Sequence, residues 1–229
     1  MRKFLNSRTG WLLGLLGLVL MVPGLAFATP ISITNSSFEA DVANGSWSSG
    51  AEGQWNGSIT GWVSSGGTFK PATVPYSAGI PYVAAVPDGV NVAWSNGGTI
   101  SQVLADTLQP GDYTLQAYVG WRGDLPNRGF PNWPGYAVQL YAGGNFLAQE
   151  YFLTPAGGTF DLSTVNYHAT GTDPNLGGHL EIMLVTNGVQ VNFDQVTLDY
   201  VPLPPSLLLL GSGLVGLGFL GRRRSWFRN

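Results

Sequence analysis

Short runs in which apolar and polar residues alternate recur through the middle of the chain, separated by turn residues. Alternation with a period of two predicts half-buried β-strands, whereas the 3.6-residue period of an amphipathic helix is hard to find here. We therefore predict an all-β domain over residues 29–200, with strands at 31–34, 59–63, 90–94, 99–104, 113–121, 136–141, 146–152, 159–162, 164–168, 179–185 and 189–200, and a short edge strand at 82–85.

Turn residues join these strands. Asn96-Gly97 favours positive φ between strands 90–94 and 99–104, and Gly143-Gly144 joins the next clear pair. Asn187-Gly188 predicts that the last two strands form a long hairpin. Residues 41–57 are rich in Gly, Ser and Trp and are predicted to be a loop, after which Trp62 should point inward. So many short strands without an internal repeat predict a two-sheet β-sandwich of jelly-roll type.

The N-terminal apolar run has the composition of an export signal. Arg2, Lys3 and Arg8 precede apolar residues 11–22, and Ala26-Phe27-Ala28 has the small-x-small pattern of a signal-peptidase site. We predict a signal peptide over residues 1–28, export across the inner membrane, and a mature chain that begins at Thr29.

Residues 201–229 form a second apolar terminus. They run Val201-Pro202-Leu203-Pro204, then an uncharged stretch at 206–221, then Arg222-Arg223-Arg224. At about 1.5 Å per helical residue the uncharged stretch would span roughly 24 Å, somewhat less than a bilayer core of about 30 Å. We predict a transmembrane helix whose arginines stay on the cytoplasmic side.

This combination of proline motif, apolar span and arginine cluster resembles the PEP-CTERM class of bacterial sorting signals. The class usually has Glu where this chain has Leu203. The resemblance implies recognition by an exosortase-type membrane transpeptidase, cleavage near the prolines, and delivery to the surface or matrix of a Gram-negative bacterium. The alternative is an ordinary C-terminal anchor that stays uncut.

The domain between the two ends is strongly acidic. All 13 acids lie between Glu39 and Asp199, against three bases, Lys70, Arg122 and Arg128. Because phosphate contacts need a basic surface, this charge balance argues against nucleic acid as a partner. The chain has no cysteine, so an exported domain must be held together by its core, with or without a metal ion.

Four motifs in order resemble galactose-binding-like and carbohydrate-binding-module sandwiches. They are residues 35–39, 59–62, 108–115 and 192–198. The resemblance implies a jelly-roll domain, often glycan-binding, with a structural calcium ion held by Glu39 and Asp194. Calcium takes six to eight oxygen ligands, so Asn35 or Asn192 would help to complete the shell. The alternative is that both acids accept hydrogen bonds in turns or pair with a surface charge.

Residues 121–134 form a long polar and aromatic loop between two well-patterned strands. Long loops on a rigid scaffold tend to carry function, and exposed aromatic faces can stack on sugar rings. We predict a ligand-binding platform made of Trp121, Arg122, Arg128 and Trp133. The alternative is that these aromatic side chains cap an open end of the core.

Catalysis has little support in the sequence. There are two histidines, His168 and His179, and neither Gly-x-Ser-x-Gly nor His-Glu-x-x-His occurs. We predict that the chain is not an enzyme but an exported cell-surface or biofilm-matrix protein that contacts extracellular polysaccharide. Two alternatives stay open: a structural surface protein without a ligand, and a glycoside hydrolase whose paired carboxylates come from Asp112, Glu150, Asp161 and Glu181.

Overall fold

The strands of this chain span most of its described part. The computed structural model describes residues 27–41, 43, 45–46, 53–71, 83–130 and 132–203. The elements are β1 (Thr29–Pro30), β2 (Gly45–Ser46), β3 (Gly53–Asn56), β4 (Val63–Ser64), β5 (Gly67–Pro71), β6 (Val92–Ser95), β7 (Gly98–Thr107), β8 (Gly111–Trp121), the 3-10 helix η1 (Leu125–Arg128), β9 (Tyr136–Ala142), β10 (Asn145–Glu150), β11 (Phe160–Ala169), β12 (His179–Thr186) and β13 (Val191–Pro202).

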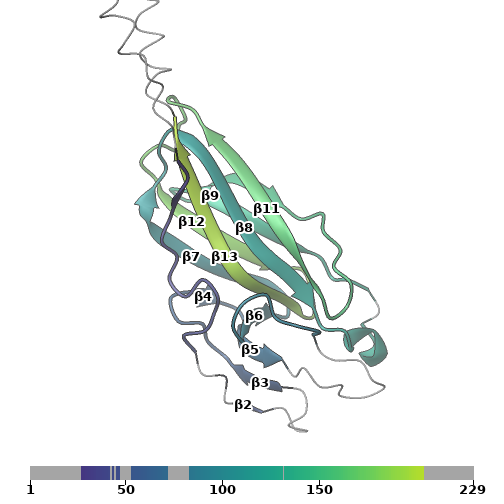
Figure 1. Ribbon diagram of the computed structural model, residues 1–229. Helices are drawn as coiled ribbons and strands as arrows, with labels where there is room; N and C mark the ends of the chain where they lie inside the picture. The colour runs from purple at the N-terminus through teal and green to yellow at the C-terminus, as the bar shows by residue number, and fades with distance from the viewer. Residues whose placement is uncertain are drawn as a thin grey trace, which may run out of the picture. The chain divides into compact units, whose positions relative to one another are not determined.

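The strands form two antiparallel sheets. Within the described residues, sheet A has eight strands in the order β11-β8-β13-β6-β5-β3-β2, with β1 also paired to β13. Sheet B has five strands in the order β10-β9-β12-β7-β4. In Figure 1, β8, β11 and β13 lie in front of β7, β9 and β12. The prediction of an all-β, two-sheet sandwich is confirmed.

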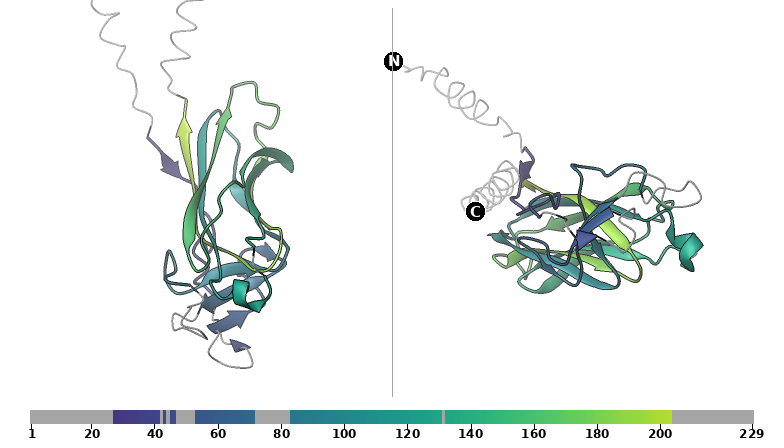
Figure 2. Two further views of the ribbon diagram at one scale, coloured as in Figure 1. Left: turned by 90° about the vertical axis from the view of Figure 1, so that its right-hand side faces the viewer. Right: turned by 90° about the horizontal axis from the view of Figure 1, so that it is seen from below.

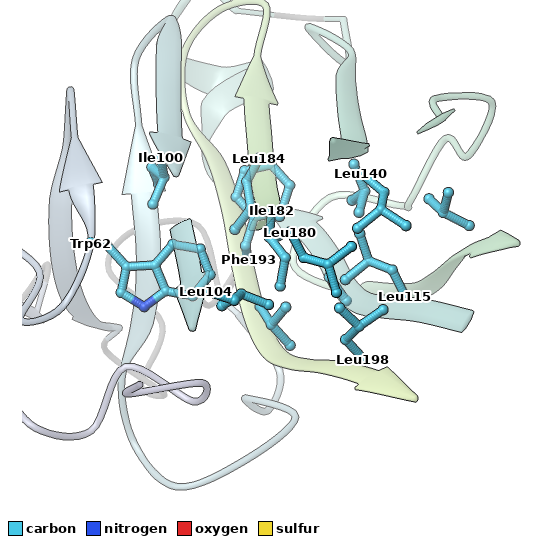
Figure 3. Packing of buried hydrophobic residues seen from close by; sticks show 14 of the residues in the cluster. Trp62, Ile100, Leu104, Leu115, Leu140, Leu180, Ile182, Leu184, Phe193 and Leu198 are labelled. Atoms are coloured by element: carbon cyan, nitrogen blue, oxygen red, sulfur yellow. The ribbon is translucent and has the colours of Figure 1, made fainter. Parts of the chain in front are cut away.

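The core lies between the sheets and follows the alternation in the sequence. Every second residue of β8, from Tyr113 through Leu115 to Val119, is buried, as are Leu180, Ile182 and Leu184 of β12. Figure 3 shows Leu115, Leu140, the β12 side chains and Phe193 meeting in this layer. Burying each such side chain contributes about 1.5–3 kcal/mol, which makes this layer the main source of stability.

Several consecutive strands cross from one sheet to the other. β12 pairs with β7 and β9 in sheet B, whereas β13 pairs with β6 and β1 in sheet A, so the predicted hairpin around Asn187-Gly188 is wrong. The predicted hairpin at Gly143-Gly144 is confirmed: β9 pairs with β10, and both glycines have positive φ (57° and 80°). A turn motif sets the local bend, whereas the partner of each strand depends on distant residues.

Other strands differ locally from the prediction. β11 is continuous where two short strands were predicted, residues 31–33 are not a strand, and the predicted loop at 41–57 contains β2 and β3. The inward orientation of Trp62 is confirmed, because its side chain is 8% exposed and its Nε1 donates to the carbonyl oxygen of Thr34 at 3.0 Å.

The two termini are only partly described. Residues 28–201 make one compact unit, and β13 continues to Pro202. The predicted signal peptide (1–28) and sorting signal (201–229) lie outside the described residues, except for residues 27–28 and 201–203. No helix in the described part is long and apolar enough to cross a membrane. Figure 2 shows η1 at the end of the sandwich opposite β1 and the end of β13.

Candidate active site

The outer face of sheet A carries a layer of aromatic side chains. Cross-strand pairs place Trp55 beside Phe69, Phe69 beside Val92, and Trp94 beside Asn192. Paired residues share a face of the sheet, and successive residues alternate between faces. Ala93 and Phe193, which also pair, lie in the core. The aromatic layer therefore lies on the side of sheet A away from the core; its members are Trp55, Phe69, Trp94 and Phe160, packed with Val86 and Val92.

Asp194 lies on β13 at this outer face. Its side chain is 0% exposed. Its Oδ2 accepts a hydrogen bond from the backbone N–H of Asp88 at 2.8 Å, and its Oδ1 accepts one from the N–H of Gln195 at 2.7 Å. Gln195 has a φ of 47°, which marks an irregularity in the strand just after the carboxyl. Two backbone N–H groups therefore hold the Asp194 carboxyl in place.

The surroundings of Asp194 favour its protonated form. Burial and, to a smaller extent, the charges of Asp88 and Glu39 raise its pKa, the two backbone hydrogen bonds lower it, and the net result is a pKa of about 7. A carboxyl with this pKa can both donate and accept a proton near neutral pH, which is what general acid–base chemistry requires. A buried acid with a strongly perturbed pKa is therefore the first candidate for a catalytic group.

A surface hollow of about 300 Å³ lies beside this region. It is lined by the loop residues Ala84, Ala85, Val86 and Pro87, by Tyr118 of β8, and by Gly158, Thr159 and Phe160. The same loop continues to Asp88, which donates to Asp194. Val86 and Phe160 belong to both the hollow and the aromatic layer, so the hollow and the layer are continuous.

The predicted ligand platform has a packing role in the structure. Trp121 is 5% exposed, its Nε1 donates to the carbonyl oxygen of Pro155 at 2.9 Å, and its ring meets that of Trp133 edge-on at 5.8 Å. Trp133 packs against the core. Arg122 is buried and bonds to Asp124 at 2.8 and 2.9 Å and to Gln190 at 2.9 Å. These residues close one end of the sandwich, so Trp121 offers no free face for stacking.

Arg128, the remaining member of that predicted platform, ends η1. Its side chain lies outside the described part of the chain. The predicted contact of Arg128 with a ligand therefore stays a prediction.

Glu39 and Asp194, the predicted calcium ligands, lie in the same neighbourhood but do not assemble a metal site. Glu39 Oε1 accepts hydrogen bonds from the N–H groups of Val90 (2.8 Å) and Asn91 (2.6 Å), and its Oε2 accepts one from Asn91 Nδ2 (3.2 Å). The described residues contain no group of three or more His, Cys, Asp or Glu that could hold a metal ion. Both carboxylates accept backbone N–H hydrogen bonds in this structure, and no chemical step is assigned to a metal.

The acids considered for glycoside hydrolysis are dispersed. Asp112 pairs with His168 at 2.6 Å on the surface, whereas Asp161 lies near the opposite end of the pairing between β8 and β11. Glu150 accepts hydrogen bonds from Tyr136 and Ser163. Asp112 and Asp161 therefore do not share a site.

The aromatic face is the part of the site that sequence reasoning missed. Asp194 was singled out, but for a metal. Trp55, Phe69 and Trp94 come from three strands, of which β3 was predicted to be loop and β5 was not predicted. The alternation in residues 92–95 was the only available signal, and it does not reveal which other strands share the face.

This chain resembles solved structures of cyclases, and the similarity covers nearly the whole length of each of those cyclase chains. A Stig cyclase, FisC from Fischerella sp. TAU, in complex with (3Z)-3-(1-methyl-2-pyrrolidinylidene)-3H-indole, is 29% identical, with a TM-score of 0.60 over 77% of this chain and 99% of that chain. A cyclase from Fischerella sp. TAU in complex with 4-(1H-indol-3-yl)butan-2-one is 27% identical, with a TM-score of 0.54 over 76% and 98% of the two chains. An apo cyclase from Fischerella sp. is 26% identical, with a TM-score of 0.57 over 76% and 97%.

Carbohydrate-binding modules are also among the similar structures. One, described as CBM4, is 13% identical, with a TM-score of 0.40 over 74% of this chain and 99% of that chain. Comparison with curated proteins gave no match.

The family comparison corrects the functional predictions. Residues 29–199 match the HpiC1-like family, described as HpiC1 cyclase. The predictions of a non-enzymatic, glycan-binding surface or matrix protein are therefore wrong, because the family and the solved cyclases indicate an enzyme that forms rings. Sorting by an exosortase stays a prediction. Architecture alone does not determine activity, so the four motifs that resemble carbohydrate-binding modules do not carry glycan binding over to this chain. Since the match spans most of the sequence, the chain belongs to the HpiC1-like family of cyclases.

Proposed function

We propose that this protein is a cyclase whose acid is Asp194 and whose substrate lies on the aromatic face of sheet A. The observation that carries the proposal is a fully buried carboxyl with a pKa of about 7 beside aromatic side chains and a hollow. Sites of this kind, largely apolar with a few convergent polar groups, are typical of small-molecule enzymes.

The chemistry proceeds by proton transfer. The Asp194 carboxyl gives its proton to an unsaturated carbon of the substrate, and the π electrons of that double bond form the new C–H bond. A second π bond of the same molecule then attacks the cationic carbon and closes the ring with a new C–C bond. Loss of a proton from the cyclised cation to the carboxylate restores the acid. The product is an isomer of the substrate, so no oxidant or co-reactant is needed.

The aromatic layer supports the cationic stage. Faces of Trp and Phe rings attract a positive charge through the ring quadrupole, by about 0.5–2 kcal/mol each depending on desolvation. Trp55, Phe69, Trp94 and Phe160 supply such rings on the face of sheet A that carries the acid. Their apolar surface also excludes water, which would otherwise trap the cation as an alcohol.

The substrate class follows from shape and from the relatives. A flat apolar layer beside one polar group fits a planar aromatic molecule with an unsaturated side chain. Two of the similar cyclase structures hold indole-bearing molecules. We therefore assign to this chain an indole that carries an unsaturated chain at its C3 position.

Turnover tests this proposal. The wild-type protein should convert a 3-alkenyl indole into a product of equal mass and different chromatographic retention, and Asp194→Asn should lower kcat by about 10²-fold or more. Asp112→Asn serves as the matched control, because Asp112 is a surface acid paired with His168. Equal rates in wild type and Asp194→Asn would contradict the role of Asp194, and no isomerised product with any indole would contradict the cyclase assignment.

We also propose that the sandwich is of the jelly-roll type. The alternation of strands between the sheets from β6 to β9 and from β11 to β13 supports this connectivity. A solved structure of the protein would test it directly: an order of strands in either sheet other than the one described here would contradict it.

We propose, independently of the activity, that the chain is exported. The support is the basic residues Arg2, Lys3 and Arg8, the apolar run at 11–22 and the small residues Ala26 and Ala28. Sequencing the N-terminus of the protein purified from its host tests this. A mature chain that starts at Thr29 is the expected result, and a retained Met1 in the active protein would contradict it.

A further inference from the structure

Asn192 is a buried amide without a hydrogen-bond partner. Its side chain is 0% exposed, and neither Oδ1 nor Nδ2 has a partner in the described structure. Buried polar side chains nearly always have at least one partner, and leaving one unsatisfied costs about 1–3 kcal/mol per group. An amide with both ends unsatisfied is therefore a cost to stability that calls for an explanation.

The side chain of Asn192 faces the proposed active site. Val191 and Phe193, on either side of it in β13, point into the core, so Asn192 points to the outer face. It pairs across the sheet with Trp94 of the aromatic layer. Asp194 is two residues away on the same face, about 7 Å along the strand. Both side chains are fully buried.

The residues flanking Asn192 explain why it has no internal partner. Arg122, just after β8, bonds to Gln190, just before β13, and β8 lies beside β13 in sheet A. Gly120 of β8 follows the core residue Val119, so it lies on the same outer face as Asn192, and it offers no side chain there. A Cβ on Gly120 would lie 2.3 Å from the carbonyl oxygen of Thr159, so the position has to be glycine. On the other flank, Trp94 Nε1 already donates to the carbonyl oxygen of Thr68.

We infer that Asn192 is the residue that orients the substrate by hydrogen bonding. Its Oδ1 accepts the ring N–H of a planar aromatic heterocycle, and its Nδ2 donates to a second heteroatom of the same molecule. This role rests on the proposed function and deepens it: Asp194 supplies the proton, and Asn192 fixes which carbon faces that acid. The amide also selects an N–H heterocycle over a ring of the same shape that lacks a donor.

A pair of ligands tests the inference without any mutation. The probes are 4-(1H-indol-3-yl)butan-2-one and its benzofuran counterpart, in which an oxygen replaces the ring N–H without adding bulk. Isothermal titration calorimetry on the wild-type protein should show about tenfold weaker binding of the benzofuran, as expected for one hydrogen bond to a desolvated group. Equal affinities would overturn the role of Asn192 and leave the cyclase assignment standing. Failure to bind either molecule would overturn both the role of Asn192 and the proposed indole substrate.

A matched pair of variants adds a stability readout. Leu has the branching of Asn without its polar atoms, so Asn192→Leu should keep or raise the thermal midpoint and abolish the preference for the indole. Thr68→Val is the control: Thr68 Oγ1 is also buried and without a partner, but Thr68 pairs with Ala93 and therefore faces the core side of the sheet. It should keep or raise the midpoint and retain the preference. A lower midpoint in Asn192→Leu would overturn the inference, because it would show that the amide stabilises the fold.

Discussion

At the scale of single residues, Asp194 shows how one carboxyl can be prepared for proton transfer. Burial raises its pKa most, and the nearby acids Asp88 and Glu39 act in the same direction. The two backbone hydrogen bonds oppose this shift and hold the carboxyl in one orientation. The result is an acid that is neither fully charged nor fully neutral at pH 7.

The activity should depend on pH through this residue. The protonated carboxyl is the active form in the protonation step, so kcat/KM should be constant well below pH 7 and should fall about tenfold per pH unit above it. A pH–rate profile measured from pH 5 to 9 checks this. A rate that rises through pH 7 would mean that the carboxylate, acting as a base, starts the reaction.

Stability should depend on pH through the same group. The folded-state pKa of Asp194, about 7, is raised above its ordinary value of 3.8, so the native state holds this proton more tightly than the unfolded state does. The stabilising contribution is complete below about pH 4 and is lost as pH rises towards 7, a change of a few kcal/mol. Urea unfolding of wild type and Asp194→Asn at both pH values should show this decline in the wild type alone. Parallel pH profiles would contradict it.

At the scale of elements, the loop at residues 83–91 connects the hollow to the acid. Its N–H groups bond to Glu39 at Val90 and Asn91 and to Asp194 at Asp88. Gly89 makes this close approach feasible: its φ is 59°, and a Cβ there would lie 2.4 Å from Glu39 Oε1. The loop therefore positions the carboxyl as well as lining the site.

Gly89→Ala should loosen this loop. We expect it to lower the free energy of unfolding by about 1–3 kcal/mol, through left-handed strain and the displaced Glu39, and to lower kcat as well. Gly97→Ala is the control, because Gly97 also has positive φ (102°) but a Cβ there meets nothing within 4 Å. Urea unfolding and turnover should separate the two variants: Gly97→Ala loses some stability and keeps its kcat. Equal loss of kcat in both would remove the positioning role of the loop.

Some strands could be predicted from the sequence, whereas the pairing between strands could not. The long alternating strands, such as β8 and β12, were recognisable because one face of each is buried and the other is not. The pairing of β12 and β13 was predicted wrongly because Asn187-Gly188 fits a hairpin turn, although the two strands belong to different sheets. Strand partners depend on side-chain packing across the fold, and no local motif encodes them.

At the scale of the whole molecule, one end of the sandwich is held together by buried aromatic and charged side chains at the end of β8 and in the loop that follows it. Arg122 and Asp124 form a buried ion pair whose side chains are 6% and 8% exposed. Trp121, Trp133 and Tyr136 pack together beside it. The buried ion pair and the packed aromatic rings therefore stabilise this end of the sandwich.

Removal of one charge from this pair should be costly. Arg122→Met takes the guanidinium away from a buried carboxylate, so we expect a loss of about 3–5 kcal/mol in the free energy of unfolding. The double variant Arg122→Met, Asp124→Leu should recover much of that loss, because no charge is then left buried. Chemical denaturation of the single and double variants measures both effects. A single variant as stable as wild type would show that the pair contributes nothing.

The candidate site could be predicted only in part. Asp194 stood out in the sequence because of its motif, but its chemistry depends on burial and on Asp88 and Glu39, which are far from it in the chain. The aromatic layer depends on the register of four strands. Neither burial nor strand register can be read from one sequence. The motif at residues 192–198 therefore pointed to Asp194 but not to its role as an acid.

The central claim is that Asp194 protonates a carbon of the substrate and so starts ring closure. Running the reaction with a 3-alkenyl indole in D₂O tests this most directly, because the exchangeable proton on the carboxyl becomes a deuteron. We expect a cyclised product that carries one deuterium at the protonated carbon, and almost no product from Asp194→Asn. A cyclised product without deuterium, or one formed as fast by Asp194→Asn, would contradict it.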